Sequence, residues 1–179
     1  MPGLELDREV LNAESSFEDF FRQKYPSVYA GLLITFRDPQ VAEDAAEEAF
    51  AKAWLRWGRV RQMDHPRAWV ARVAFHHVIE QRSRSKRDQE ESQAAGVLEQ
   101  VPPHDADVAL KVDLESLLGT LSHRQRAVLV LRYYLDMSTK DTAKALRIAE
   151  GTVKRYCADA LQRLAQRTSP GERALRKPD

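Results

Sequence analysis

Apolar side chains recur at helical spacing along most of this 179-residue chain, whereas the alternation typical of strands is absent. After Pro39, apolar side chains recur at every fourth residue, at Val41, Ala45, Ala49 and Ala53. After Pro66, a second apolar face is expected from Trp69, Val70, Val73, Ala74 and Val78. The pattern therefore predicts an all-α protein built from amphipathic helices.

Helix-start signals divide the first half of the chain into three segments. Ser15 and Ser16 precede acidic residues by three positions, which is a capping-box spacing and predicts a start just after them. Pro26 lies inside this first segment, and we expect it to kink or split the helix. Asp38 stands directly before Pro39, and Asp64 stands two residues before Pro66; they predict the starts of the second and third segments.

The second half contains four further helical segments. An amphipathic pattern covers residues 108–121. Ser122 with Gln125, and Ser138 with Asp141, are spaced as N-terminal caps and predict the next two starts. The fourth segment contains the sequence EGTVKRYCADALQRL.

Between the two halves the helical periodicity fades. This stretch is acidic, lacks aromatic residues and contains Pro102 and Pro103, which is typical of an extended linker. We therefore expect two small helical domains at 1–87 and 108–168, joined by an acidic flexible linker at 88–107 and followed by a short C-terminal tail at 169–179.

The formal net charge of +1 conceals four blocks of opposite sign. Residues 1–50 carry 4 basic and 11 acidic side chains, and residues 51–87 carry 10 basic and 2 acidic ones. Residues 88–110 carry 6 acidic and no basic side chains, and residues 111–179 carry 14 basic and 8 acidic ones. Such segregation favours a protein that meets both a polyanion and a basic partner, although chance clustering of surface charge remains the alternative.

Enzyme signatures are missing from the chain. It contains no phosphate-binding glycine loop, no HExxH and no CxxC, so we expect neither catalysis nor a cofactor or metal. Cys157 is the single cysteine and excludes an internal disulfide, which fits a reducing compartment. No secretory signal or membrane-length apolar run is present, and we expect a cytoplasmic protein.

Residues 138–161 have the spacing of a helix-turn-helix. Ala143 is small enough for the point where the two helices meet, and the core beneath the turn would contain Leu146, Ile148 and Val153. The exposed start of the second helix then carries Thr152, Lys154 and Arg155, which supply the hydroxyl and cations that DNA contacts require. A structural helical hairpin without DNA binding remains the alternative for this segment alone.

Two residues depart from the usual helix-turn-helix chemistry. Arg147 stands where glycine commonly adopts the left-handed conformation, and Ala149 stands where a serine or aspartate cap is expected.

A second basic stretch carries interleaved tryptophans at Trp54, Trp57 and Trp69. Its cations are Arg56, Arg59, Arg61, Arg67 and Arg72. This combination suits single-stranded DNA, because aromatic rings stack on unpaired bases. At least one tryptophan must lie in the core, and we expect it to be Trp54 or Trp69.

Together these segments resemble a bacterial sigma factor of the extracytoplasmic function (ECF) type, within the sigma-70 family. Residues 38–57 resemble regions 2.1–2.2, residues 65–84 resemble regions 2.3–2.4, and residues 121–164 resemble region 4. The resemblance implies a non-catalytic factor that binds core RNA polymerase, recognises the −35 and −10 promoter elements, and promotes DNA melting and transcription initiation. Its partners would be the β′ clamp helices, the β flap, duplex −35 DNA and single-stranded −10 DNA, with an anti-sigma factor as a further candidate and a place on the nucleoid when bound to polymerase.

The resemblance also implies roles for individual residues. The −35 element would be read by Lys140, Glu150, Gly151, Thr152, Lys154, Arg155 and Ala158. The −10 element would be bound and melted by Arg56, Trp57, Arg59, Arg61, His65, Arg67, Trp69, Arg72 and His76. The polymerase core would be contacted by Asp44, Glu47, Glu48, Phe50 and Trp54.

The chain departs from the common family pattern at Glu47, Phe75, His76, Glu80, Tyr156, Cys157 and Asp159. We expect these departures to leave the fold intact and to alter the usual −10 and −35 preferences. Two other functions stay open at this point: a stand-alone helix-turn-helix regulator that does not bind polymerase, and a degenerate sigma-like interaction protein.

Overall fold

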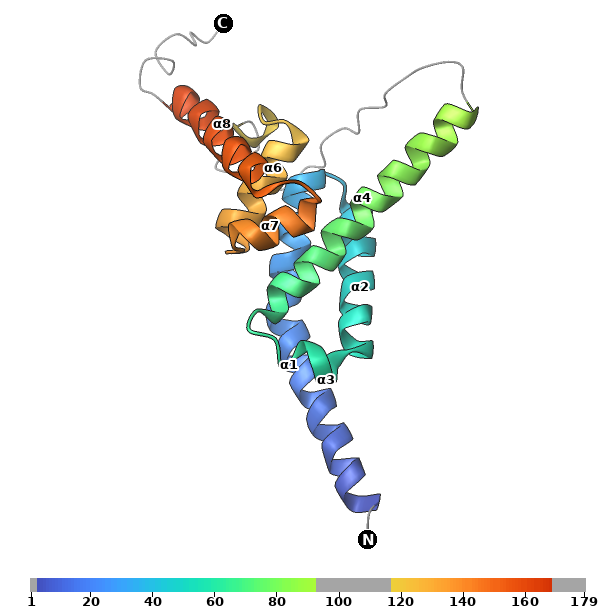
Figure 1. Ribbon diagram of the computed structural model, residues 1–179. Coiled ribbons are helices and arrows are strands. Elements are labelled where there is room, and N and C mark those ends of the chain that lie inside the picture. The colour runs from blue at the N-terminus through green and yellow to red at the C-terminus, as the bar shows by residue number, and fades with distance from the viewer. Residues whose placement is uncertain (1–2, 93–116, 169–179) are drawn as a thin grey trace, which may run out of the picture. The chain divides into compact units, whose positions relative to one another are not determined.

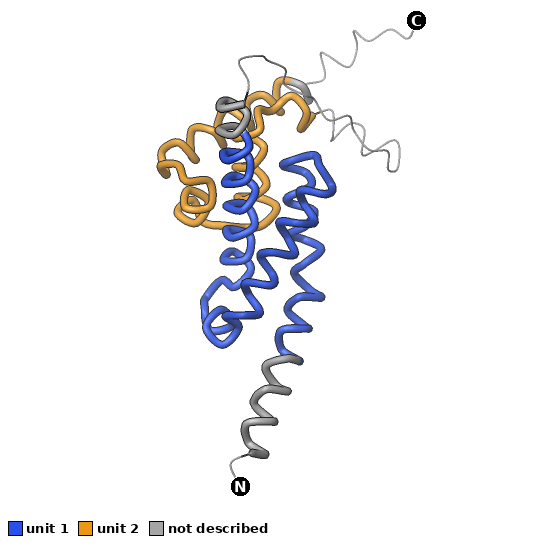
Figure 2. The backbone as a smooth tube through the Cα atoms, turned by 90° about the vertical axis from the view of Figure 1, so that its right-hand side faces the viewer, with its two compact units in different colours: residues 1–99 blue, residues 100–179 orange. Residues whose placement is uncertain are grey.

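The computed structural model describes residues 3–92 and 117–168, and within these ranges every element is helical. The chain divides into two compact units, unit 1 at residues 1–99 and unit 2 at residues 100–179 (Figure 2). The prediction of an all-α protein with two helical domains is therefore confirmed. The tail at 169–179 and all but the first residues of the expected linker lie outside the described ranges.

Unit 1 consists of α1 (Gly3–Phe36), α2 (Pro39–Leu55), α3 (Trp57–Val60) and α4 (Pro66–Ser92) (Figure 1). The central helix is α2, which packs against both α1 and α4. Its buried face consists largely of alanines, at Ala42, Ala45, Ala46, Ala49 and Ala53. Because alanine side chains are short, the neighbouring helices can approach α2 closely.

The start of α2 follows its sequence signal. Asp38 accepts a hydrogen bond from the backbone N–H of Val41 at 3.1 Å, and Pro39 occupies the first helical position. The expected cap at Asp38 is confirmed.

The start of α1 differs from the sequence prediction. The helix begins at Gly3, so Ser15 and Ser16 lie in its interior and do not cap it. Nor does Pro26 split the helix, which continues to Phe36. Pro26 removes one backbone N–H, but the packing of α1 against α2 and α4 provides stability that local propensity does not.

The buried face of α4 is also rotated from the predicted one. Val70, Ala74 and Val78 are fully buried as expected, but Trp69 and Val73 are only half-buried. The remaining core positions belong to Ala71 and to Phe75, whose ring lies 5.4 Å from that of Phe36. The helix runs to Ser92 and so includes the first residues of the linker expected at 88–107.

Unit 2 consists of α6 (His123–Leu129), the π-helix η1 (Val130–Tyr134), α7 (Thr139–Leu146) and α8 (Glu150–Thr168). Ser122 and Gln125 form the expected capping box at α6, and Ser138 caps α7 through the N–H of Asp141 at 3.0 Å. Both predicted starts are confirmed. The helix expected at 108–121 lies mostly outside the described residues.

None of the helices in the described parts of the chain is long and apolar enough to cross a lipid bilayer.

Candidate nucleic-acid interface

The orientation of α8 follows from the small core beneath it. Val153 is buried together with Val128 and Ala143, and half-buried side chains complete the cluster: Leu146, Ile148, Tyr156 and Cys157. Further along α8, Ala160 packs with Leu121 and Leu129. With 3.6 residues per turn, the face of α8 opposite Val153 and Ala160 points outward.

The outward face of α8 carries the residues predicted to read the −35 element. Exposed side chains or backbone are found at Glu150, Gly151, Lys154, Arg155 and Ala158, and Thr152 is half-buried beside them. Lys140 is exposed on the preceding helix, α7. The tertiary structure therefore places six of the seven predicted residues on one helix and the seventh on its helix-turn-helix partner.

The turn between α7 and α8 has the expected left-handed residue. Arg147 has φ 53° and ψ 47°, a conformation that costs a residue with a Cβ about 1–2 kcal/mol. The backbone N–H of Ile148 donates to the carbonyl of Ala143 at 3.0 Å and closes the turn. This prediction, made from the position of Arg147 in the motif, is confirmed.

Ala149 directly precedes α8, and its carbonyl accepts from the N–H groups of Thr152 and Val153. Its methyl group cannot cap the helix, so we expect Ala149→Ser to raise the free energy of unfolding by about 1 kcal/mol. The opposite change, Ser138→Ala, removes an existing cap and should lower it by a similar amount. Urea denaturation of the full chain, followed by circular dichroism, measures both changes in the free energy of unfolding. If the two substitutions change it equally and in the same direction, the cap assignment is contradicted.

Gly151 occupies its position for no reason internal to the fold. A Cβ there would meet no atom within 4 Å, and the residue does not have positive φ. The same holds for Gly58, which lies between Trp57 and Arg59. A glycine on an exposed surface allows close approach of a partner to the backbone, which fits nucleic-acid contact at both positions.

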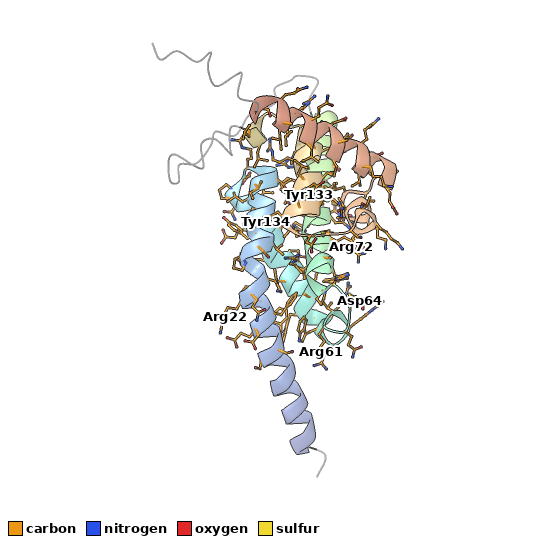
Figure 3. All side chains as sticks on the ribbon, turned by 90° about the vertical axis from the view of Figure 1, so that its left-hand side faces the viewer. Arg22, Arg61, Asp64, Arg72, Tyr133 and Tyr134 are labelled. Carbon is orange, nitrogen blue, oxygen red and sulfur yellow. The ribbon has the colours of Figure 1, made fainter. Side chains whose placement is uncertain are left out.

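The basic surface of unit 1 has an exposed and a half-buried part. The exposed part comprises Arg56, Arg59, Arg61 and His65, in and around α3. The half-buried part lies on α4, where Trp69, Arg72 and His76 follow helical spacing and share one face. Figure 3 shows Arg61 and Asp64 between α3 and α4, and Arg72 on α4. Arg67 is seven residues before the buried Ala74 and therefore lies toward the packed side of α4.

Trp57 is a core residue, which corrects two predictions. Its side chain is only 7% exposed, and its indole N–H donates to Ser16 Oγ at 2.8 Å. Its ring lies 5.0 Å from that of Phe20 and 5.3 Å from that of Phe17. Trp57 therefore cannot stack on a −10 base in this conformation, and the core tryptophan is neither Trp54, which is 42% exposed, nor the half-buried Trp69.

The predicted polymerase-binding residues on α2 separate into surface and core. Asp44 and Glu47 are exposed, and Glu48 is half-buried beside Lys52, with which it forms an ion pair at 2.9 Å. The hydrogen bond from Lys52 lowers the pKa of the Glu48 carboxyl. Phe50 is only 2% exposed, so its assignment to the docking surface was wrong.

Phe50 instead supports the surface from within. Its ring packs 5.1 Å from Phe21 and 5.5 Å from Tyr25 on α1. Burial and the nearby carboxylates, Glu47 foremost, raise the pKa of the Tyr25 hydroxyl.

An exposed apolar group beside this acidic face was missed at the sequence level. Phe21 is 38% exposed and Leu55 is 80% exposed, next to the exposed Trp54. Leu55 stands outside the alanine row of α2, which is the signal that could have identified it. In unit 2, Tyr133 and Tyr134 on η1 are likewise exposed (Figure 3).

The single cysteine of the chain, Cys157, lies on α8. Burial raises the pKa of the Cys157 thiol, an effect that nearby Arg132 opposes, so this half-buried group packs as a thiol and not as a nucleophilic thiolate. Within residues 3–92 and 117–168, no group of three histidine, cysteine, aspartate or glutamate side chains is arranged to hold a metal ion.

Comparison with known proteins finds a separate family match in each of the two units. The family model for Sigma-70 region 2 matches residues 20–88, and the model for Sigma-70 region 4 matches residues 111–164. The chain is 30% identical over 152 residues to the RNA polymerase sigma-E factor of Streptomyces coelicolor, covering 84% of each chain. It is 29% identical over 164 residues to the ECF RNA polymerase sigma factor SigM of Mycobacterium tuberculosis, covering 90% of this chain and 81% of the relative.

A solved structure supports the fold. The sigma factor RpoE of Bartonella quintana, crystallised with the anti-sigma factor NepR, superposes with a TM-score of 0.67 at 21% sequence identity. The match covers 84% of this chain and 95% of that one.

Proposed function

Because this chain belongs to the ECF group of the sigma-70 family and is an RNA polymerase sigma factor, we propose that each described unit carries its own promoter contact. In this proposal α8 reads the −35 element, and α3 with α4 binds the −10 element. As a sigma factor the protein is a non-enzymatic transcription initiation factor that acts with RNA polymerase. The observation that carries the proposal is the exposed row Gly151, Lys154, Arg155 and Ala158, which lies opposite the buried row of α8.

The −35 contact uses the major groove. A helix whose first turns carry exposed cations, a hydroxyl and a glycine can approach base edges and phosphates with its N-terminal end. Within the described ranges no carboxylate forms an ion pair with Lys154 or Arg155, which supports a role for both cations in binding DNA. The cations are tolerated at the positive end of the helix dipole because the negative charge of bound DNA offsets their repulsion from that end.

The −10 contact uses a surface that combines cationic side chains with aromatic rings. The exposed Arg56, Arg59 and Arg61 would follow the phosphates of an opened strand, and Trp69 with His76 would meet unpaired bases. Trp57 contributes indirectly, because its packing against α1 supports the short helix α3. Phe75 is buried and takes no part in base contact.

Polymerase docking uses α2 in this proposal. Asp44 and Glu47 present carboxylates on an exposed helix face that ends at the exposed Trp54. This combination of anions and one aromatic anchor fits a basic helical partner, which in a sigma factor is the β′ clamp, while unit 2 binds the β flap.

Reversing one charge on this face tests the docking assignment. We expect Asp44→Lys or Glu47→Lys to lower the affinity for core polymerase by about tenfold, because a repulsive pair replaces an attractive one. Asp19→Lys, which makes the same charge change at an exposed position on α1, is the matched control. Fluorescence titration with core enzyme measures the affinities, and circular dichroism verifies helical content. Equal affinities for the three variants and the wild type would place the docking face elsewhere.

An anti-sigma factor and a cytoplasmic location also belong to the proposal. The solved structure that this fold resembles contains an anti-sigma factor. The exposed apolar side chains of Phe21, Trp54 and Leu55 offer such a partner a surface on unit 1. A partner bound there would compete with core polymerase for the chain.

Reconstitution tests the proposed function directly. The purified protein is added to sigma-free RNA polymerase core, and the 5′ ends of transcripts from genomic DNA are sequenced. We expect discrete start sites that share −35 and −10 elements. Core binding without specific starts would indicate a degenerate sigma-like protein, and binding to duplex DNA without core binding would indicate a stand-alone regulator.

A further inference from the structure

Two opposite charges on the outward face of α8 stay apart although their spacing would allow an ion pair. Arg155 and Asp159 are four residues apart and both exposed. The same spacing produces ion pairs on α1, between Glu18 and Arg22 at 2.6 Å, and on α2, between Glu48 and Lys52 at 2.9 Å, although Glu150 and Lys154 on α8 form none. Among the residues that the structure describes, no ion pair or hydrogen bond joins Arg155 to Asp159.

The guanidinium of Arg155 is held by an aromatic ring instead. Its central carbon lies 5.5 Å from the centroid of Tyr156, within the range of a cation–π contact. The cation also precedes the anion along the helix, which is the weaker order for an ion pair at this spacing. In the structure the guanidinium therefore lies over the ring and not against the carboxylate.

Tyr156 is fixed in place by the fold. It is half-buried and packs against the cluster of Val128, Ala143 and Val153 beneath the helix-turn-helix. A ring anchored in this way restricts the side chain that lies over it. Arg155 is thus directed by a core residue, whereas Asp159 remains exposed on the next turn.

The chemistry of the two separated groups is complementary. A guanidinium only donates hydrogen bonds and pairs with the O6 and N7 acceptors of guanine, whereas a carboxylate only accepts and pairs with the N4 amino group of cytosine. Four residues of helix advance about 6 Å, which corresponds to about two base pairs along the duplex. An ion pair between Arg155 and Asp159 would consume both groups.

We infer that Tyr156, Arg155 and Asp159 act as one base-reading unit, in which Tyr156 keeps Arg155 away from Asp159, Arg155 selects guanine, and Asp159 selects a cytosine about two base pairs away. This inference rests on the proposed role of α8 at the −35 element. Asp159 also repels phosphates, so it lowers affinity for DNA without the cytosine while it raises discrimination.

Selection from a promoter library tests the inference. Holoenzyme reconstituted with core polymerase selects from duplex DNA randomised across the −35 element, and the wild type should enrich a motif that contains the cytosine. Asp159→Ala should reduce the cytosine preference at one position by about tenfold, and at the same time tighten binding to DNA that lacks the motif. Asp159→Asn should transfer the preference at that position from cytosine to adenine, because an amide pairs with adenine N6 and N7.

Two controls separate charge from position. Asp136→Asn removes an exposed carboxylate outside α8 and should leave the motif unchanged. Tyr156→Phe keeps the ring and should retain both preferences, whereas Tyr156→Leu should weaken selection of guanine and cytosine together.

The outcomes distinguish the inference from the function beneath it. A wild-type −35 motif that is the same in Asp159→Ala and Asp159→Asn overturns the inference and leaves the reading of −35 DNA by α8 in place. A wild type that enriches no −35 motif, while its core binding persists, removes the proposed role of α8 itself.

Discussion

Replacing Trp57 by alanine should lower the free energy of unfolding of the protein by about 3–5 kcal/mol, which is the usual cost of deleting a large buried aromatic side chain. The ring is 7% exposed and lies between Phe17 and Phe20 of α1, so its removal leaves a cavity that these neighbours cannot easily fill. The substitution also removes the indole N–H that donates to the hydroxyl of Ser16. Urea denaturation of the full chain, followed by circular dichroism at the helical band, measures the loss.

Three variants locate the origin of this effect. Trp54→Ala removes a tryptophan that is 42% exposed and should cost clearly less. Ser16→Ala leaves the ring in place and the buried N–H unpaired, which costs about 1–3 kcal/mol. Trp57→Phe keeps most of the ring and should fall between Ser16→Ala and Trp57→Ala. If Trp54→Ala and Trp57→Ala destabilise the protein equally, the packing described for Trp57 is incorrect.

On α8, Arg155→Ala should lower the affinity of the holoenzyme for its selected promoter by about 1–3 kcal/mol and relax base preference at one −35 position, because a base-reading guanidinium is lost. Lys154→Ala should weaken binding to all sequences to a similar degree. In this variant the slope of the logarithm of the binding constant against the logarithm of the salt concentration should fall in magnitude by about 1, since one phosphate contact is lost. Promoter binding measured between low and moderate salt separates the two effects.

Arg124→Ala is the matched control for this pair, because Arg124 is an exposed cation on α6, outside the outward face of α8. It should leave both base preference and salt slope unchanged. If neither Lys154→Ala nor Arg155→Ala alters the slope or the preference, α8 does not face DNA.

The burial of Trp57 could have been read from the sequence. The row at every fourth residue that passes through Ala49 and Ala53 continues to Trp57, and the structure buries all three. The neighbouring arginines suggested a nucleic-acid surface, and Trp57 was therefore assigned to the residues that contact DNA. Phe50 was assigned wrongly for a related reason. In the sequence it lies between the exposed Glu47 and Trp54, but its ring packs against Phe21 and Tyr25 of α1.

The sequence alone determined the helical class, the caps at Asp38, Ser122 and Ser138, and the left-handed turn at Arg147. These features depend on hydrogen bonds and backbone conformations within a few residues, so local sequence is sufficient to predict them. The continuity of α1 through Pro26 and the burial of Phe50 were decided by tertiary structure. The reason is physical: a proline is tolerated, and a large side chain becomes core or surface, according to which helices pack against that face, and those partners lie far away in sequence.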